Sequence, residues 1–145
     1  MRRLVMLTVS LLVLLAGISS APALEVKDRA KAPASWWDAT APMAIAPQYF
    51  DQVLAAYGLK LVDASKAPPT YARKVGDNVV WETAPRTYTP AEMDQILSAY
   101  GATLATDAKL PPTYATVVDG KPVFATGPIA WSPTVINSIL AGYKI

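Results

Sequence analysis

Two stretches 43 residues apart, DQVLAAYG at residues 51–58 and DQILSAYG at residues 94–101, decide the fold of this chain. The similarity extends outward in both directions, so that residues 47–89 and 90–132 are identical at 18 of 43 positions without a gap. Self-similarity at a fixed spacing of this length is typical of domains built from copies of one small unit. The sequence therefore predicts a single repeat-built domain over residues 36–145.

A short proline motif occurs three times at the same spacing. Its copies are Thr40-Ala41-Pro42, Thr83-Ala84-Pro85 and Thr126-Gly127-Pro128, and a second proline follows each copy. Proline suits the first position of a helix, because its φ is already fixed and its missing N–H has no partner there in any case. Three helices are therefore predicted to begin at Pro47, Pro90 and Pro133.

Each predicted helix has one apolar face, with apolar residues at positions i, i+3, i+4 and i+7. The second helix also has a capping box formed by Thr89 and Glu92. Gly58 and Gly101 follow the first two helices, at the position where a glycine commonly ends a helix. The predicted core residues are Phe50, Val53, Leu54, Tyr57, Met93, Ile96, Leu97, Tyr100, Ile136, Ile139, Leu140 and Tyr143.

Strands are predicted between the helices. Residues 71–83 and residues 114–126 have the pattern of two hairpins, the second around Asp119-Gly120, which is a preferred two-residue turn. Residues 36–40 align with the second strand of each hairpin and are expected to form a strand too. Further short strands are predicted at residues 59–62 and 102–105.

The predicted order of elements is β-α-β-β-α-β-β-α, which is an α+β fold. We expect an antiparallel or mixed sheet with the three helices on one face, because each helix has a single apolar stripe to bury. The alternative is a short α/β solenoid in which each unit stacks on the next.

The first 23 residues have the three parts of a secretory signal peptide. The basic pair Arg2-Arg3 precedes the apolar run 4–18, and Ala21-Pro22-Ala23 provides a cleavage site. The run is shorter than the roughly 20 apolar residues of a membrane-spanning helix, and an uncleaved anchor is the alternative. Residues 24–35 are expected to form a flexible lead-in. The predicted localisation is periplasmic or secreted, with no stable membrane anchor after cleavage.

Charge and composition narrow the functional classes. The chain carries 13 Lys and Arg against 11 Asp and Glu, and removal of Arg2 and Arg3 leaves the remainder neutral. Nucleic-acid binding is not expected, because it depends on a basic surface. The chain contains no His and no Cys, which are common catalytic groups and metal ligands. We therefore expect no cofactor, no metal site and no enzymatic activity.

Two acids keep an enzymatic alternative open. Asp51 and Asp94 occupy the same position in the two copies, and paired carboxylates can hydrolyse glycans. An acid near the start of a helix also complements the positive end of the helix, so no catalytic residue is assigned. A carrier of a small apolar ligand, held between sheet and helices, is the other alternative.

Aromatic residues are the candidate binding residues. Trp37, Tyr88 and Trp131 lie in or near the proline-stiffened loops, where an exposed ring would make a platform for a sugar or a partner's side chain. Tyr71 and Tyr114 end two PPTY segments, a type of segment that can dock in an aromatic groove. We expect an exported, non-enzymatic binding or assembly protein that engages a protein or glycan partner through these loops. Self-association through an exposed end strand is a further expectation.

Overall fold

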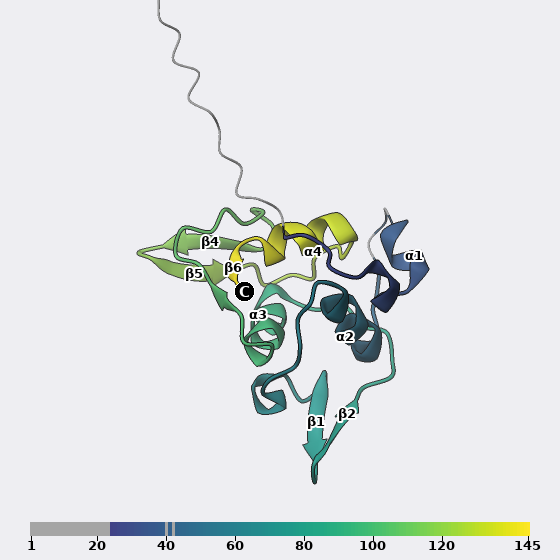
Figure 1. Cartoon of the computed structure of the whole chain (residues 1–145). Coiled ribbons are helices and arrows are strands. Elements are labelled where there is room, and N and C mark those ends of the chain that lie inside the picture. Colours follow the sequence, from purple (N-terminus) through teal and green to yellow (C-terminus); the bar gives the residue numbers. More distant parts are fainter. Residues whose placement is uncertain (1–23, 40, 42) are drawn as a thin grey trace, which may run out of the picture.

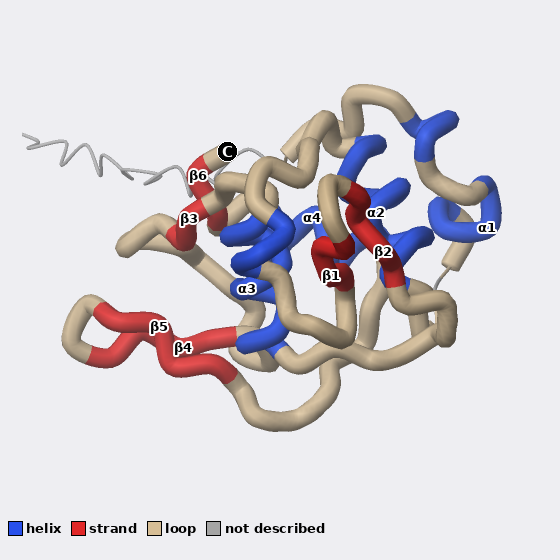
Figure 2. The backbone as a smooth tube through the Cα atoms, turned by 90° about the horizontal axis from the view of Figure 1, so that it is seen from below, coloured by secondary structure: helices blue, strands red, loops and turns tan. Residues whose placement is uncertain are grey.

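The computed structural model describes residues 24–39, 41 and 43–145. This part of the chain has a mixed α+β fold with four α-helices and three small antiparallel sheets of two strands each. Figures 1 and 2 show helices around the centre of the molecule and hairpins that project outward from it. The predicted signal peptide, residues 1–23, lies outside the described residues, as do Thr40 and Pro42 of the first proline motif.

The helices and strands are interspersed along the chain. Two short 3₁₀ helices, η1 (Arg29–Lys31) and η2 (Ala64–Lys66), lie ahead of α1 and β1. The other elements follow in the order α1 (Ala34–Trp37), α2 (Pro47–Ala56), β1 (Ala72–Val75), β2 (Asn78–Trp81), α3 (Pro90–Ala99), β3 (Thr103–Leu104), β4 (Ala115–Val118), β5 (Lys121–Phe124), α4 (Pro133–Leu140) and β6 (Tyr143–Lys144).

The three long helices confirm the predictions made from local sequence. Each begins at its proline. At α3 the Thr89 hydroxyl accepts a hydrogen bond from the Glu92 N–H, and the Glu92 carboxylate accepts one from the Thr89 N–H at 2.8 Å. Gly58 and Gly101 follow their helices with φ of +83° and +79°, a conformation that any side chain would strain. All twelve predicted core residues are buried.

Both predicted hairpins are present. β1 pairs with β2 and β4 pairs with β5, each in antiparallel register. The second hairpin turns at Asp119 and Gly120, which have φ of 51° and 73°, as a type I′ turn requires. Within the predicted strand at 102–105, β3 forms and pairs with β6, whereas residues 59–62 contain no strand.

The strands do not join into the one sheet that we predicted. Each pair stands alone in the described part of the chain, so the three long helices do not cover one face of a common sheet. The predicted strand at residues 36–40 is also wrong. Trp36 and Trp37 lie in α1, and the Trp36 N–H donates to the Pro33 carbonyl at 2.9 Å. This first segment has no hairpin to pair with, so a helical turn satisfies its backbone instead.

Residues 24–35 are not a free lead-in. The N–H groups of Lys27 and Asp28 both donate to the Ala56 carbonyl at the end of α2, at 3.0 and 2.9 Å. Val62 and Asp63 make the same pair of bonds to the Ala99 carbonyl at the end of α3, at 2.9 and 3.0 Å. Since backbone groups at a helix end need partners, each of these segments completes the helix on which it lies.

A sequence signal for this docking exists, at a different spacing. The stretch LEVKDRAKAP at residues 24–33 matches LKLVDASKAP at residues 59–68, 35 residues later instead of 43. The difference of eight residues corresponds to a hairpin that follows the second stretch and is missing after the first. An alignment at a spacing of 43 residues therefore does not show this match.

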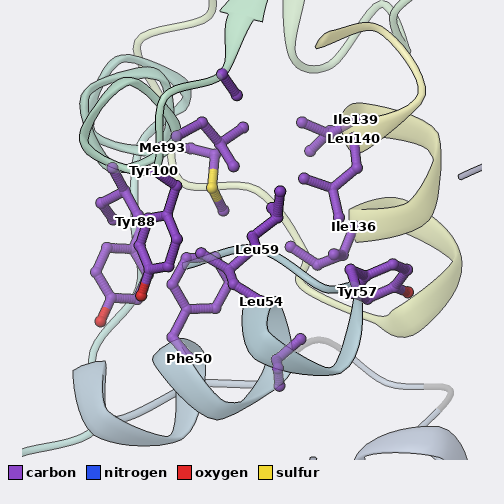
Figure 3. Packing of buried hydrophobic residues seen from close by; sticks show 14 of the residues in the cluster. Phe50, Leu54, Tyr57, Leu59, Tyr88, Met93, Tyr100, Ile136, Ile139 and Leu140 are labelled. Carbon is purple, nitrogen blue, oxygen red and sulfur yellow. The ribbon is translucent and has the colours of Figure 1, made fainter. Parts of the chain in front are cut away.

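An aromatic cluster around Phe50 occupies the centre of the molecule. The Phe50 ring centroid lies 5.5 Å from that of Tyr88, 6.1 Å from that of Tyr71 and 6.2 Å from that of Trp131. Figure 3 shows Phe50 on α2 facing Tyr88 and Tyr100, with Ile136, Ile139 and Leu140 of α4 across the core. Fully burying a side chain of this size contributes about 1.5–3 kcal/mol, so the cluster binds distant segments of the chain together.

Candidate functional site

The polar groups in the core form two short chains of hydrogen bonds. In the first, the Tyr100 hydroxyl donates to the Asp51 carboxylate on α2 and also lies 3.1 Å from the Tyr71 hydroxyl. In the second, the Tyr143 hydroxyl donates to the Asp94 carboxylate on α3 at 2.8 Å and lies 2.8 Å from the Tyr114 hydroxyl. Corresponding residues of the two chains are 43 positions apart, so equivalent residues meet in equivalent ways.

The hydroxyls in these chains are held neutral. Burial raises the pKa of Tyr71, Tyr100, Tyr114 and Tyr143 above the usual value for tyrosine. Burial also raises the pKa of Asp51, and the hydrogen bond from Tyr100 partly offsets that rise. A neutral tyrosine donates and accepts hydrogen bonds but does not act as a base. The arrangement therefore joins helices through satisfied polar groups.

Asp51 and Asp94 belong to two different chains of hydrogen bonds. Each carboxylate accepts a hydrogen bond from a different tyrosine, in a different chain of bonds. Within the described residues, no group of three or more His, Cys, Asp or Glu side chains is arranged to hold a metal ion. The residues of the glycan-hydrolase alternative therefore have a packing and bonding role in this structure.

Alkaline titration tests the buried state of the tyrosines. Burial raises the pKa of six of the seven tyrosines, whereas tyrosine in an unfolded chain ionises near pH 10. The stability they provide is complete below about pH 10 and is lost as the pH rises above it. We expect tyrosinate absorbance to rise in one steep step that coincides with the loss of circular dichroism. A gradual rise centred near pH 10 with the dichroism retained would contradict the burial.

Four of the five predicted contact residues lie in the core. Tyr71, Tyr88, Tyr114 and Trp131 are fully buried, so they do not form the exposed aromatic platform that we predicted. Their size explains this: a molecule with no disulfide and a modest core needs its large rings inside. Each PPTY segment leads directly into the first strand of a hairpin, and its tyrosine packs into the core.

Trp37 is the fifth predicted contact residue, and it is partly buried. Its Nε1 donates to the Arg29 carbonyl at 3.1 Å, and its ring lies 6.1 Å from the Tyr57 ring. The Arg29 guanidinium sits over the indole at 4.7 Å from the centroid. Trp37 therefore joins η1 to the end of α2. In the two hairpins, Trp81 packs against Tyr71 and Phe124 packs against Tyr114.

Three surface pockets lie beside the proline motifs, at corresponding residues. Their volumes are about 310, 380 and 280 Å³. Each is lined by the hydroxyl-bearing residue ahead of the buried aromatic, namely Ser35, Thr70 or Thr113. Each is also lined by the residue that follows the proline of the motif, namely Met43, Arg86 or Ile129. The positions of the aromatic residues did not predict these pockets. The pockets lie beside the repeated proline motif.

The pocket at the second motif differs from the other two because a residue that forms a salt bridge lines it. Arg86 pairs with Glu92 on α3, and its guanidinium lies 4.9 Å from the centroid of the Tyr88 ring. The corresponding pairs are Met43 with Tyr49 and Ile129 with Val135, which are uncharged. Tyr49 and Val135 line their pockets, whereas Glu92 does not line the second one.

No helix among the described residues has the length and apolar character needed to cross a membrane. Comparison of the chain with protein-family models, with curated proteins and with solved structures finds no match in any of the three.

Proposed function

We propose that this chain is an exported, non-enzymatic binding or assembly protein that engages a protein or glycan partner through its repeated proline loops. The observation that supports this proposal best is the recurrence of a surface pocket at corresponding residues of all three loops. Equivalent pockets on one small molecule suit attachment to a partner at several points, which raises overall affinity without a large single interface.

The architecture behind this proposal is a threefold repeat. In it, residues 24–58, 59–101 and 102–145 are copies of one unit, and the first copy lacks the hairpin. The matched docking of residues 27–28 and 62–63 on their helix ends supports this division, as do the two tyrosine–aspartate chains. A unit of this size cannot cover its own apolar face, so the copies are stable only when packed together.

Hydrogen bonds join the first and second loops to each other. Ile45 and Arg86 form an antiparallel bridge between the first and second loops, with hydrogen bonds of 2.9 and 3.2 Å. The Tyr88 hydroxyl donates a further bond to the Ile45 carbonyl at 3.3 Å. A surface that is ordered before binding loses less conformational entropy when a partner docks.

Affinity capture tests the binding function. The chain, tagged after the exposed Ile145, is used to capture partners from the exported fraction and to probe an array of glycans. A variant with charged side chains at the two uncharged pockets, through Met43→Arg with Tyr49→Glu and Ile129→Arg with Val135→Glu, is the comparison. We expect it to lose the partners that the native chain retains. Equal retention by both chains would rule out the loops as the contact surface.

Cleavage of the signal peptide during export would lower the mass of the protein. When the full gene is expressed in a bacterial host with its own N-terminal segment, the protein recovered outside the cytoplasm is expected to consist of residues 24–145. Mass spectrometry of the purified protein measures this directly. Replacing Ala21 and Ala23 with bulky residues should block cleavage, because the protease accepts small side chains at these positions. Recovery of an uncleaved chain from the cytoplasm would contradict the export proposal.

A further inference from the structure

We propose that the pocket at the first proline loop binds an extended, proline-rich segment of a partner protein. This inference rests on the proposed binding function and names the chemistry of the partner at one site. The pocket has a volume of about 310 Å³, which is at the lower end of the range for ligand sites and suits one or two small rings.

The walls of this pocket are uncharged and offer a ring at the rim. Pro33 and Pro85 form part of the wall, together with apolar residues of α2 and of the loop. Tyr49 lines the pocket and is 47% exposed, which is unusual in a chain whose other large rings are mostly inside. An uncharged wall favours an uncharged occupant, because a charge would lose its hydration without gaining a partner.

A second observation concerns the base of the pocket. Trp36 lines it and is only 2% exposed, and its Nε1 has no hydrogen-bond partner among the described residues. A buried donor without a partner costs about 1–3 kcal/mol, and a peptide carbonyl is its natural complement. Because the Nε1 is covered, the occupant reaches it only when a side chain of the pocket moves, and side-chain movements of this kind are common on binding.

Hydrogen-bonding capacity favours proline over a sugar. Each hydroxyl of a buried sugar needs a partner, and among the described residues that line this pocket there is Ser35 but no Asp, Glu, Asn, Gln or Arg. A proline residue brings a carbonyl acceptor and no N–H, so it leaves no donor unsatisfied in a largely apolar site. Proline-rich segments are also extended before they bind, and they recurrently dock in grooves lined by aromatic residues.

The second loop carries charged residues at the same place. There Arg86 and Glu92 stand where the first loop has Met43 and Tyr49, and they form a salt bridge. Transplanting this pair with Met43→Arg and Tyr49→Glu (the closed first loop) therefore puts charged side chains into the uncharged wall of the proposed site, using residues that the second loop already accepts. The matched control is Ile129→Arg with Val135→Glu, which makes the same change at the third loop.

The test measures binding of a short capped peptide of Ala-Pro-Pro triplets to the purified chain. Calorimetry gives the dissociation constant, and nuclear magnetic resonance follows the indole N–H signals of the four tryptophans, with Trp36 assigned by Trp36→Phe. We expect the peptide to shift the Trp36 signal and an Ala-Gly-Gly peptide of equal length to bind at least about tenfold more weakly, a difference of about 1.4 kcal/mol. The closed first loop should lose binding, and the third-loop control should keep it.

Three outcomes would overturn the inference. They are equal binding of the two peptides, unchanged binding by the closed first loop, and binding of a glucose trimer in place of the peptide with a shift at Trp36. In each case capture of a partner through the loops is measured separately, so the proposed function can stand while the proline inference fails. A chain that binds the peptide but captures no partner would support the proline inference and contradict the proposed function.

Discussion

Replacing Phe50 by alanine is expected to lower the free energy of unfolding by about 3–5 kcal/mol, the range for removing a large buried aromatic side chain. Phe50 is fully buried, and its ring contacts Tyr71, Tyr88 and Trp131, which come from three later segments of the chain. The loss combines burial of apolar area with a cavity that three stiff rings cannot fill by relaxing. Urea unfolding followed by tryptophan fluorescence measures the change.

The neighbouring residue provides a matched control. Tyr49→Ala changes an aromatic side chain of similar size one position earlier on the same helix, but Tyr49 is 47% exposed. Substitutions at exposed sites usually change stability by less than about 0.5 kcal/mol, and the same experiment should show an effect of that order. Similar losses from both substitutions would show that Phe50 is not the centre of the core.

The sequence predicted the long helices and the hairpins because their signals are local. Proline and Thr89 set a helix start, a glycine sets its end, and Asp119-Gly120 sets a tight turn. These features fix backbone angles and hydrogen bonds within a few residues, independent of what packs against them. The twelve buried residues on the helix faces were predicted for the same reason, since helical periodicity alone puts them on one side.

The arrangement of the strands could not be predicted from such signals. Pairing between distant strands depends on which surfaces the helices leave open, and the helices here bury their faces around a shared aromatic cluster instead of a sheet. The helix α1 was missed because Trp36 and Trp37 were aligned at a spacing of 43, whereas residues 24–33 match residues 59–68 at a spacing of 35. At a spacing of 35, Trp36 aligns with Tyr71, and both are buried.

The proline loops named in the sequence analysis are lined by surface pockets, but most of the predicted contact residues are not exposed there. The proline motifs mark the loops that line the pockets, but Tyr88 and Trp131 turn inward. An aromatic residue in a loop has no periodicity to indicate whether it faces solvent, and a small chain without disulfides uses its largest side chains for the core. The informative signal was the residue after each motif, where a charged Arg86 replaces the apolar Met43 and Ile129.

Removing one hydroxyl from the second chain of hydrogen bonds is the other large effect that we expect. Tyr143→Phe leaves the ring in place and removes the group that donates to Asp94 and contacts Tyr114. The partly buried carboxylate then loses its donor, and leaving such a group without a partner costs about 1–3 kcal/mol. Denaturant unfolding at neutral pH measures the loss.

The control for this change is Tyr57→Phe. Tyr57 occupies the corresponding position after α2 and is equally buried, but its hydroxyl makes no hydrogen bond to a described residue, so little stability should be lost. A double-mutant cycle with Asp94→Ala isolates the bond itself, and a coupling of about 1 kcal/mol or more is expected for groups in direct contact. If the coupling were near zero, Tyr143 and Asp94 would only fill space. The hydrogen bond between them would then not contribute to holding α3 against β6. A clear coupling would mean that α3 and β6 are joined by a specific polar contact as well as by apolar burial, and such a contact selects one packing of similar helices over shifted alternatives.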